Sequence, residues 1–479
     1  MKTDRRSLDP ADWGEFRAQG HRMLEEMLDY LERIRGRPVW QPIPEETRAK
    51  FLEPLPRQPG DLAQVHETFM DSILPFAVGN AHPGFMGWVH GAGAPAGMLA
   101  EILAAGLNTN LGGRDQIPIE VERQILAWMR ELFDFPPAAS GIFVTGTSMA
   151  NLLGLLVART AALGIEVRRR GVAADGRRLV AYTSEVAHSC IAQAMDLSGF
   201  GSDALRLVRV NAGHEIDVAA LDQVMTADRA AGRTPFLVAG TAGTVDIGAI
   251  DDLAALAEVA QRHRAWFHVD GAFGALGLLA PDVAPRLAGI QRADSIAFDF
   301  HKWGQVPYDA GYILVRDGTL HQQTFETSSS YLARDRRGMS ANSPWPCDFG
   351  PDLSRGFRAL KTWFTFKVYG AEALGRSISH CCELARTLQQ RIESEPALEM
   401  LAPVPLNIVC FGFRCADPDR VNADLVVALQ ESGIAAPSST VVNGRLAIRA
   451  AIVNHRTTRT DIDALVDVTI RLGRSITAA

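Results

Sequence analysis

The sequence has little cysteine, and its cysteines form no recognisable metal or disulfide pattern. Six cysteines occur in 479 residues, and they make neither a CxxC pair nor a cysteine and histidine spacing that suits zinc. Disulfide-stapled proteins have a much higher density. We therefore expect reduced thiols, no metal site and a cytoplasmic location.

Long apolar runs and an excess of one charge are also missing. The first residues, "MKTDRRSLDPADWGEFRAQG", lack the apolar core of a signal peptide. The richest later run, "ANLLGLLVARTAALGI", is broken by Arg159 before it could span a bilayer. The net charge is −7, and the two signs are interleaved without a basic patch. The sequence thus predicts a small-molecule partner and neither nucleic acid nor membrane binding.

What is present suits a large globular protein, because hydrophobic residues make up 47% of the chain. Residues 1–85 predict an N-terminal helical segment. There "WGEFRAQGHRMLEEMLDYLERIRG" places apolar residues at helical spacing and ends at a glycine. A proline-rich stretch follows, so this segment is expected to be a separate lobe.

Residues 86–372 predict a large α/β domain. Short apolar runs alternate with amphipathic helical patterns such as "DDLAALAEVAQRHR". The strand-like runs are "RLVAYTS", "RLVRV", "PFLVAG", "AWFHVD", "DSIAFD" and "GYILVRD". Such alternation is typical of a mostly parallel sheet with helices on both faces.

Residues 373–479 predict a small C-terminal α/β domain. Its expected strands are "LNIVCFGF" and "RLAIRAAIV", separated by the helical pattern "PDRVNADLVVALQESG". Thr460 and Asp463 fit a capping box for a last helix.

Charged residues stand where two buried strands end. Asp270 closes "AWFHV", and His301 and Lys302 follow "DSIAF". Ligands of open parallel sheets gather at the carboxyl ends of the strands. Burial favours the neutral form of an amine, so a lysine there is a candidate for Schiff-base chemistry. The alternative is that Asp270 and Lys302 simply pair with each other.

Two further segments add to this group. In "GIFVTGTSMANLL" a strand breaks at Gly146, Thr147 and Ser148 before a helix, which suits a phosphate, although a plain helix cap has the same pattern. His188 follows another strand and can stack on a planar ring or serve structure alone. A phosphate cradle, a carboxylate, an imidazole and a lysine are together the inventory of pyridoxal 5'-phosphate (PLP).

At these residues the chain resembles the PLP-dependent group II amino-acid decarboxylases, such as aromatic-L-amino-acid decarboxylase. The resemblance runs from "HPGFMGW" at 82 to "NHRTT" at 454 and centres on "HKW" at 301–303, after "HVDGAFG" and "ADS". It implies the fold type I architecture, like that of aspartate aminotransferase. It also implies conversion of an L-amino acid to its amine and carbon dioxide.

The resemblance assigns roles to individual residues. Lys302 would be the Schiff-base lysine and Asp270 the partner of the pyridine nitrogen. His188 and Ala272 would lie on the two ring faces. The remaining cofactor contacts would be Thr147, Ser148 and His301 at the phosphate, and Thr244 along the pocket.

Three further residues, before and after the lysine, can be compared with the family. Tyr331, in the polar stretch "FETSSSYLARDRRGMSANS", matches the family's catalytic tyrosine on a mobile lid, which protonates Cα. A phenylalanine there would indicate the related aldehyde-forming branch. Asp299 and Phe300 replace the asparagine and proline of the aromatic-amino-acid enzymes, and an aspartate beside a phosphate is repulsive unless it bonds elsewhere.

The early segment "HPGFMGWVHGAG" is expected to bind the substrate side chain through Trp88, Val89 and His90. Trp88 favours an aromatic substrate, although it could belong to the core. Arg114 would favour an acidic substrate if it reached the pocket, and Asp115 could neutralise it. We expect an aromatic L-amino acid, with acidic or diamino acids such as glutamate, aspartate or 2,4-diaminobutyrate as the alternative.

The resemblance also implies a homodimer with shared active sites. Tyr331 and the segment around Leu107 and Asn108 would serve the neighbouring subunit, and the N-terminal segment would wrap it. Two rival functions remain open. One is another PLP reaction, including aldehyde synthesis. The other is a nucleotide-binding oxidoreductase, for which the glycines of "HGAGAPAG" are one residue too widely spaced.

Overall fold

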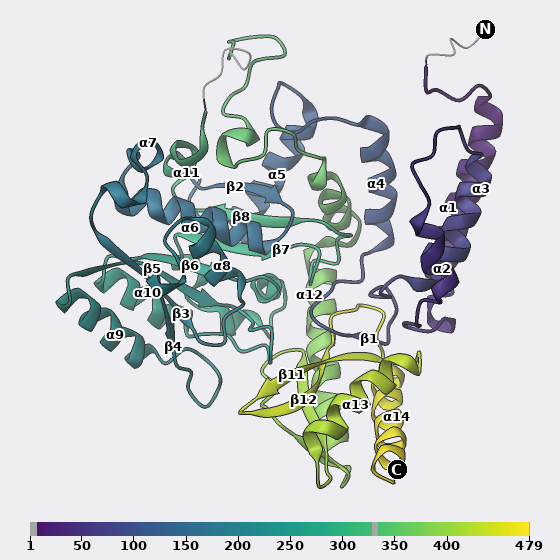
Figure 1. Cartoon of the computed structure of the whole chain (residues 1–479). Coiled ribbons are helices and arrows are strands. Elements are labelled where there is room, and N and C mark those ends of the chain that lie inside the picture. Colours follow the sequence, from purple (N-terminus) through teal and green to yellow (C-terminus); the bar gives the residue numbers. More distant parts are fainter. Residues whose placement is uncertain (1–6, 328–333, 479) are drawn as a thin grey trace.

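The computed structural model describes residues 7–327 and 334–478, and its centre is a sheet of seven strands in the order β2-β8-β7-β6-β5-β3-β4 (Figure 1). The strands are β2 (Ser140–Val144), β3 (Arg178–Ser184), β4 (Leu205–Val208), β5 (Arg233–Thr241), β6 (Trp266–Asp270), β7 (Ser295–Asp299) and β8 (Gly311–Val315). Only β8 among these strands is antiparallel to its neighbours. The other strands therefore end at one common edge of the sheet.

Helices cover both faces of this sheet, as the alternation of strands and helices predicts. Buried side chains alternate along the strands: Val269 and Ile296 join the core of one face, and Ala297 and Ile313 join that of the other. One face carries α5 (Ile117–Leu132), α9 (Val218–Ala230) and α10 (Leu253–Arg262). The other carries α6 (Thr147–Leu163), α8 (Cys190–Leu197) and α11 (Gly318–Phe325), and the short α7 (Val167–Arg170) follows α6.

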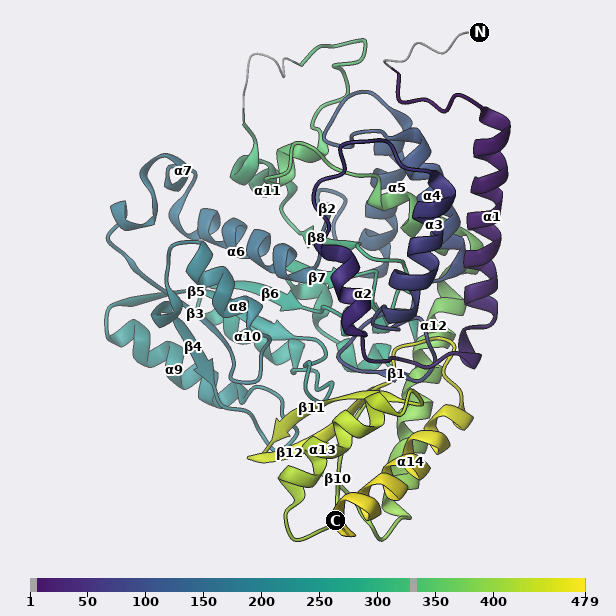
Figure 2. The same cartoon turned by 45° about the vertical axis from the view of Figure 1, so that its right-hand side comes forward.

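A second sheet of five strands, in the order β1-β11-β12-β10-β9, forms the small C-terminal domain. Its elements are β1 (Phe85–Met86), β9 (Leu398–Met400), β10 (Ile408–Phe413), β11 (Ala436–Val442), β12 (Arg445–Ala451), α13 (Pro418–Glu431) and α14 (Arg459–Ala478). The long helix α12 (Arg358–Glu393) runs from the large domain into it (Figure 2). The expected boundary at residue 372 lies inside α12, close to Gly370, whose φ of 75° interrupts the helical backbone.

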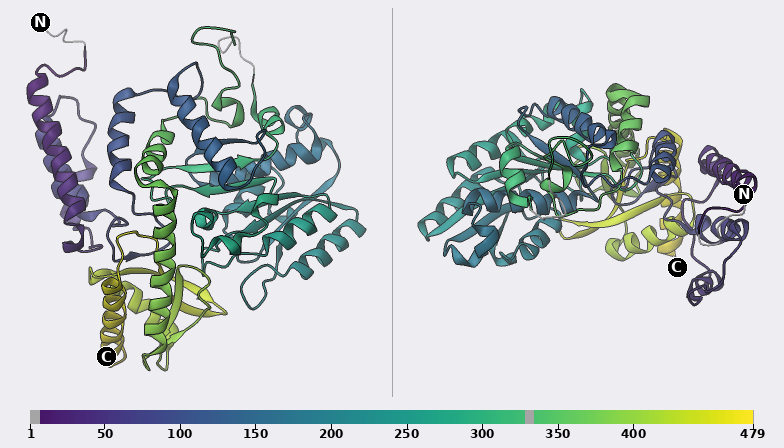
Figure 3. Two further views of the ribbon diagram at one scale, coloured as in Figure 1. Left: turned by 180° about the vertical axis from the view of Figure 1, so that it is seen from behind. Right: turned by 90° about the horizontal axis from the view of Figure 1, so that it is seen from above.

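The first residues form helices α1 (Trp13–Glu32), α2 (Glu45–Ala49) and α3 (Leu62–Thr68). They stand beside α4 (Pro95–Leu107) at one side of the molecule, apart from the large sheet (Figure 3). Helix α1 begins after Asp12, whose carboxylate accepts hydrogen bonds from the N–H groups of Gly14 and Glu15. No residue of α1 is buried within the chain. Across the described residues, no helix is both long and apolar enough to cross a membrane.

The six expected strands of the large domain and both of those in the small domain are present. The capping box expected at Thr460 and Asp463 is wrong. Helix α14 begins at Arg459, and the Asp461 carboxylate accepts hydrogen bonds from the N–H and the hydroxyl of Thr458. Thr458 and Asp461 have the same spacing, and Asp463 instead pairs with Arg391 at 3.1 Å.

Candidate active site

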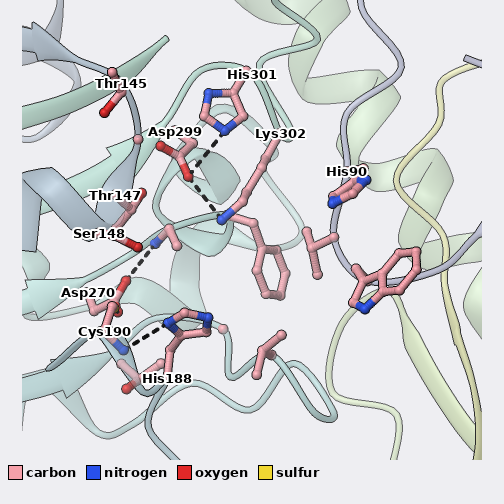
Figure 4. Close-up of a pocket in the computed structure, with 18 of the residues that line it drawn as sticks. His90, Thr145, Thr147, Ser148, His188, Cys190, Asp270, Asp299, His301 and Lys302 are labelled. Carbon is pink, nitrogen blue, oxygen red and sulfur yellow. Dashed lines mark hydrogen bonds and ion pairs between the residues drawn. The ribbon is translucent and has the colours of Figure 1, made fainter. Parts of the chain in front are cut away.

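A cavity of about 400 Å³ opens at the edge of the sheet where the parallel strands end (Figure 4). Its walls come from the ends of β2, β6 and β7, from the connection between β3 and α8, and from the segment that contains Trp88. Segments far apart in the sequence therefore meet at the position where open α/β sheets bind ligands.

One end of the cavity suits an oxyanion. Thr147 begins α6 directly after Gly146, and its buried hydroxyl has no hydrogen-bond partner among the described residues. A Cβ at Gly146 would lie 3.8 Å from both Asp299 Oδ1 and His301 Cε1, so these two side chains stand close to the start of α6. Ser148 lines the same wall. A helix N-terminus with a free hydroxyl is a suitable phosphate cradle.

His301 faces this end as a neutral ring. Its Nδ1 accepts a hydrogen bond of 3.0 Å from the N–H of Ala310, so Nε2 carries the proton of the neutral ring. Nε2 points toward Asp299 Oδ2 at 3.5 Å. Burial lowers the pKa of His301 to about 4. The side chain is therefore a donor near neutral pH without being a cation.

Lys302 is paired with Asp299, so the alternative that it simply pairs with Asp270 is wrong. Its Nζ lies 2.9 Å from Asp299 Oδ2 (Figure 4). The sequence left open whether Asp299 would repel a phosphate, and in the structure one of its carboxylate oxygens bonds to Lys302. Its second oxygen, Oδ1, is buried without a partner.

Asp270 lies at the floor of the cavity, at the end of β6. Its Oδ1 accepts a hydrogen bond of 3.1 Å from the N–H of Ala272, and its Oδ2 accepts one of 2.9 Å from Asn151. Burial raises the pKa of this carboxyl, and the charge of Lys302 and the hydrogen bonds from Ala272 and Asn151 oppose that shift. His188 stands nearby, with its Nδ1 accepting from the N–H of Cys190 at 3.2 Å.

Aromatic rings gather at the outer side of the cavity. The rings of Trp88 and His90 stack with centroids 5.6 Å apart, and Tyr308 meets His90 edge-on at 5.9 Å. Val89 and Phe273 complete this wall. Aromatic side chains offer stacking and edge contacts to another planar group. The arrangement thus joins an oxyanion end, an ion-paired lysine, a buried carboxylate and an aromatic wall.

A family model described as "Pyridoxal-dependent decarboxylase conserved domain" matches residues 44–414. The chain belongs to this family. It is 30% identical over 457 residues to an aromatic-L-amino-acid decarboxylase of Bacillus atrophaeus, covering 93% of this chain and 92% of the relative. It is 29% identical over 422 residues to an L-2,4-diaminobutyrate decarboxylase of Rhizobium meliloti, covering 87% and 83%.

Among solved structures, Oryza sativa TDC with PLP and tryptamine has a TM-score of 0.89 at 25% identity, covering 98% of this chain and 100% of that chain. The protein is thus a PLP-dependent amino-acid decarboxylase of fold type I, as the resemblance implied. The unpaired hydroxyl of Thr147 and the buried carboxylate of Asp270 fit a phosphate and a pyridine nitrogen at the two ends of such a cofactor.

Most residues that the sequence assigned to the decarboxylase site line one cavity. These are Trp88, Val89, His90, Thr147, Ser148, His188, Asp270, Ala272, His301 and Lys302. Thr244 is not among the residues that line it. Its hydroxyl instead accepts a hydrogen bond of 3.0 Å from the N–H of Ala249, and its neighbours Gly243 and Val245 face the cavity. Tyr331 lies outside the described residues.

Arg114 does not line the cavity of the decarboxylase either. Its guanidinium lies 4.8 Å from the centroid of the Trp345 ring. Asp115 does not pair with it and instead accepts a hydrogen bond of 2.7 Å from Asn342. The arginine therefore packs against an aromatic ring and is not among the described residues that line the cavity.

Sequence reasoning missed Tyr308, Cys190 and Asn151. The ring of Tyr308 lies 4.3 Å from that of His301, but "GQVPYDAG" has no feature that marks it. Asn151 sits inside a helical pattern and looks like an ordinary helix residue. The glycines of "HGAGAPAG" serve packing, because a Cβ at Gly91 would lie 2.2 Å from the His301 carbonyl oxygen. Within the described residues no cluster suits a metal ion.

Proposed function

We propose that this decarboxylase acts on an aromatic L-amino acid and releases the corresponding aromatic amine. The observation that carries this proposal is the aromatic wall of Trp88, His90 and Tyr308 beside Lys302. A planar side chain would be bound there by stacking and burial. No arginine occurs among the described residues that line the cavity, so these residues offer an acidic side chain no bidentate partner.

The bound cofactor supplies an electron-poor ring that accepts the electrons left at Cα when carbon dioxide departs. In the proposal, Lys302 would hold the cofactor through its Nζ, and Thr147, Ser148 and His301 would hold the phosphate. Asp270 would keep the pyridine nitrogen protonated, and His188 and Ala272 would flank the ring. These contacts fix the orientation of the scissile Cα–carboxylate bond, so they contribute to both rate and reaction choice.

Asp299 has a part in this scheme that the family comparison did not suggest. Its ion pair of 2.9 Å supports a role in holding the Lys302 ammonium whenever the amine is free. The same cation would offset the repulsion between the Asp299 carboxylate and a nearby phosphate. An Asp299→Asn enzyme is expected to keep its fold and to lose this ion pair.

The final protonation of Cα is assigned to Tyr331, on the resemblance alone. A Tyr331→Phe enzyme is expected to lose amine formation and to divert product toward the aldehyde. An unchanged rate of amine formation would remove Tyr331 from the mechanism and leave decarboxylation itself untouched.

We further propose a cytoplasmic homodimer whose subunits share active sites. Support comes from apolar side chains that are about half exposed among the described residues: Trp13 and Phe16 on α1, and Ile102 and Leu103 on α4. A second copy would bury them. Light scattering on the purified enzyme tests this, and an active monomer would contradict it. An Ile102→Asp variant should dissociate, whereas Leu353→Asp, on a solvent-exposed loop position, serves as a control.

The proposed substrate class is tested by initial rates over a panel of amino acids. The PLP-loaded enzyme is offered tryptophan, tyrosine and dopa alongside glutamate, aspartate and 2,4-diaminobutyrate. We expect kcat/KM to favour the aromatic members. A preference for the acidic or diamino members would overturn the aromatic assignment. Borohydride reduction followed by peptide mapping checks separately that the cofactor is attached to Lys302.

A further inference from the structure

A chain of hydrogen bonds runs from Asp270 into the core between β6, β7 and α6. Asn151 Nδ2 donates to Asp270 Oδ2 at 2.9 Å, and Asn151 Oδ1 lies 2.8 Å from His268 Nε2. His268 Nδ1 lies 2.7 Å from Ser295 Oγ. The indole N–H of Trp266 donates to the same oxygen at 2.8 Å. Asn151, His268 and Ser295 have at most 1% of their surface exposed.

The two ends of the chain fix its direction. At the inner end the indole of Trp266 can only donate, which leaves the Ser295 hydroxyl free to donate to His268 Nδ1. At the outer end an ionised Asp270 can only accept, so the Asn151 amide must present its N–H group there. His268 then carries its proton on Nε2 and donates to Asn151 Oδ1. Every donor in the chain therefore points toward Asp270.

Neighbouring residues fix the side chains of this hydrogen-bond chain in place. Gly154 lies one turn after Asn151 on α6, and a Cβ there would be 2.7 Å from His268 Cε1. Burial lowers the pKa of His268 to about 4, so the ring stays neutral and keeps a single N–H. The second proton of the Asn151 amide faces Cys190 Sγ at 3.1 Å. The amide is thus held on both sides and cannot turn without losing its partners.

We propose that Asn151, His268 and Ser295 are positioning residues that keep Asp270 ionised and aimed at the pyridine nitrogen, through hydrogen bonds that all donate in its direction. This inference rests on the proposed pairing of Asp270 with that nitrogen. A carboxylate in this buried site would otherwise be inclined to take up a proton. A protonated Asp270 would leave the ring nitrogen neutral and the ring a poorer electron acceptor.

The test follows the ring nitrogen itself. The enzyme is loaded with PLP carrying ¹⁵N in the ring, and the nitrogen resonance is followed against pH by NMR. In the unaltered enzyme we expect the nitrogen to be protonated at neutral pH and to lose its proton only at alkaline pH. In Asn151→Leu, which keeps the size and removes the donor, the proton should be lost at a pH lower by roughly 1 to 2 units. In Ser295→Ala the shift should be smaller, because His268 and Asn151 remain.

A matched control is Asn422→Leu. Asn422 is also a fully buried helical asparagine, on α13, with Oδ1 accepting from Phe413 N–H and Nδ2 donating to the Leu446 carbonyl. It should lower stability as Asn151→Leu does and leave the nitrogen titration unchanged. Lys302, His188 and Cys190 are the titratable groups that face Asp270, and all three are retained in every variant. The difference in titration between the variants therefore reports on the chain of hydrogen bonds alone.

The outcomes separate this inference from the proposed function. A neutral ring nitrogen in the unaltered enzyme would mean that Asp270 is not its partner, and the proposed role of Asp270 would fail. A protonated nitrogen whose titration is the same in the unaltered enzyme, Asn151→Leu and Ser295→Ala would overturn the inference and leave that role standing. If Asn151→Leu does not fold, the Ser295→Ala titration decides alone.

Discussion

The large sheet and the small sheet each hold a cation that is largely shielded from solvent, and the two cations have different partners. Arg449, on β12 of the small domain, is 3% exposed. Among the described residues its guanidinium donates only to neutral oxygens, including the carbonyls of Val245 and Trp88 and the hydroxyl of Ser438. Lys302, at the edge of the large sheet, has one carboxylate partner and an open cavity beside it.

The difference separates a structural cation from a chemical one. The donors of Arg449 are spread over several fixed backbone atoms, so the guanidinium ties β12 to two segments that flank the cavity. Lys302 has one ion pair among the described residues, with Asp299, and this pair can break when the amine binds the cofactor. A positive charge in a buried position does not by itself distinguish a reactive residue. In this comparison the number and kind of hydrogen-bond partners distinguish Lys302 from Arg449.

The largest expected effect comes from removing the chemical cation. Lys302→Ala should lower kcat by at least roughly a thousandfold, because the Schiff-base nitrogen is lost. The violet absorption of the cofactor bound to lysine should disappear as well. Lys367→Ala, on α12 away from the cavity, is the control and should retain both signals. Turnover by Lys302→Ala within tenfold of the unaltered enzyme would place the chemistry elsewhere.

Removing the structural cation should act on stability instead. Arg449→Met leaves buried carbonyl groups without donors and should lower the free energy of unfolding by about 3 kcal/mol. Arg449→Lys should recover only part of this, because an ammonium cannot reach the same set of acceptors. Urea denaturation measures both variants. Equal stability of Arg449→Met and the unaltered enzyme would break the comparison.

His321 is a buried base outside the cavity, so it tests the effect of burial on stability without an effect on catalysis. His321, on α11, is 0% exposed and lies 2.7 Å from the Ser140 hydroxyl, and burial lowers its pKa to about 3. The unfolded chain takes up this proton near pH 6.5 and the folded chain does not, so stability is lost as the pH falls below that value. Between pH 7 and pH 5 the loss should be about 2 kcal/mol.

His321→Gln should lack this part of the pH dependence and retain its kcat at pH 7. Unfolding curves at both pH values, measured side by side for the two proteins, give the difference directly. Parallel pH profiles would show that His321 does not hold a neutral ring in the folded state.

The smallest expected effect concerns the aromatic wall. Trp88→Leu keeps an apolar surface and removes the stacking partner of His90. KM for an aromatic amino acid should rise by about tenfold, equivalent to about 1.4 kcal/mol, with kcat less affected. Competition between tryptophan and an aliphatic amino acid sharpens the result. An unchanged ratio of their kcat/KM values would place the substrate side chain away from Trp88.

The sequence was sufficient for the fold and for most of the cavity, because both depend on local patterns. Apolar runs of strand length alternated with helices, and Asp270 and Lys302 stood at the ends of such runs. The family motif then supplied the order of the parts. Positions that depend on side-chain direction could not be obtained in this way. Thr244 turned its hydroxyl toward Ala249, and Arg114 packed on Trp345, although both stand in promising segments.

Two side-chain pairings were equally beyond the sequence. Asp299 was expected to repel a phosphate unless it bonded elsewhere, and although Lys302 follows it by only three residues, only the structure shows that the two side chains pair. Asn151 had no signal at all, since its neighbours His268 and Asp270 lie far along the chain and meet it through packing of α6 on β6. Long-range contacts of this kind leave no mark in a single sequence.

The central claim, decarboxylation of an aromatic amino acid at Lys302, is tested most directly by mass spectrometry of products. The PLP-loaded enzyme is incubated with a pool of the common L-amino acids together with dopa and 2,4-diaminobutyrate, with the Lys302→Ala enzyme as the blank. The account predicts that an aromatic amine appears, lighter than its amino acid by the mass of carbon dioxide, and that the blank forms none. Amines only from acidic or diamino acids, or keto acids and aldehydes without any amine, would contradict it.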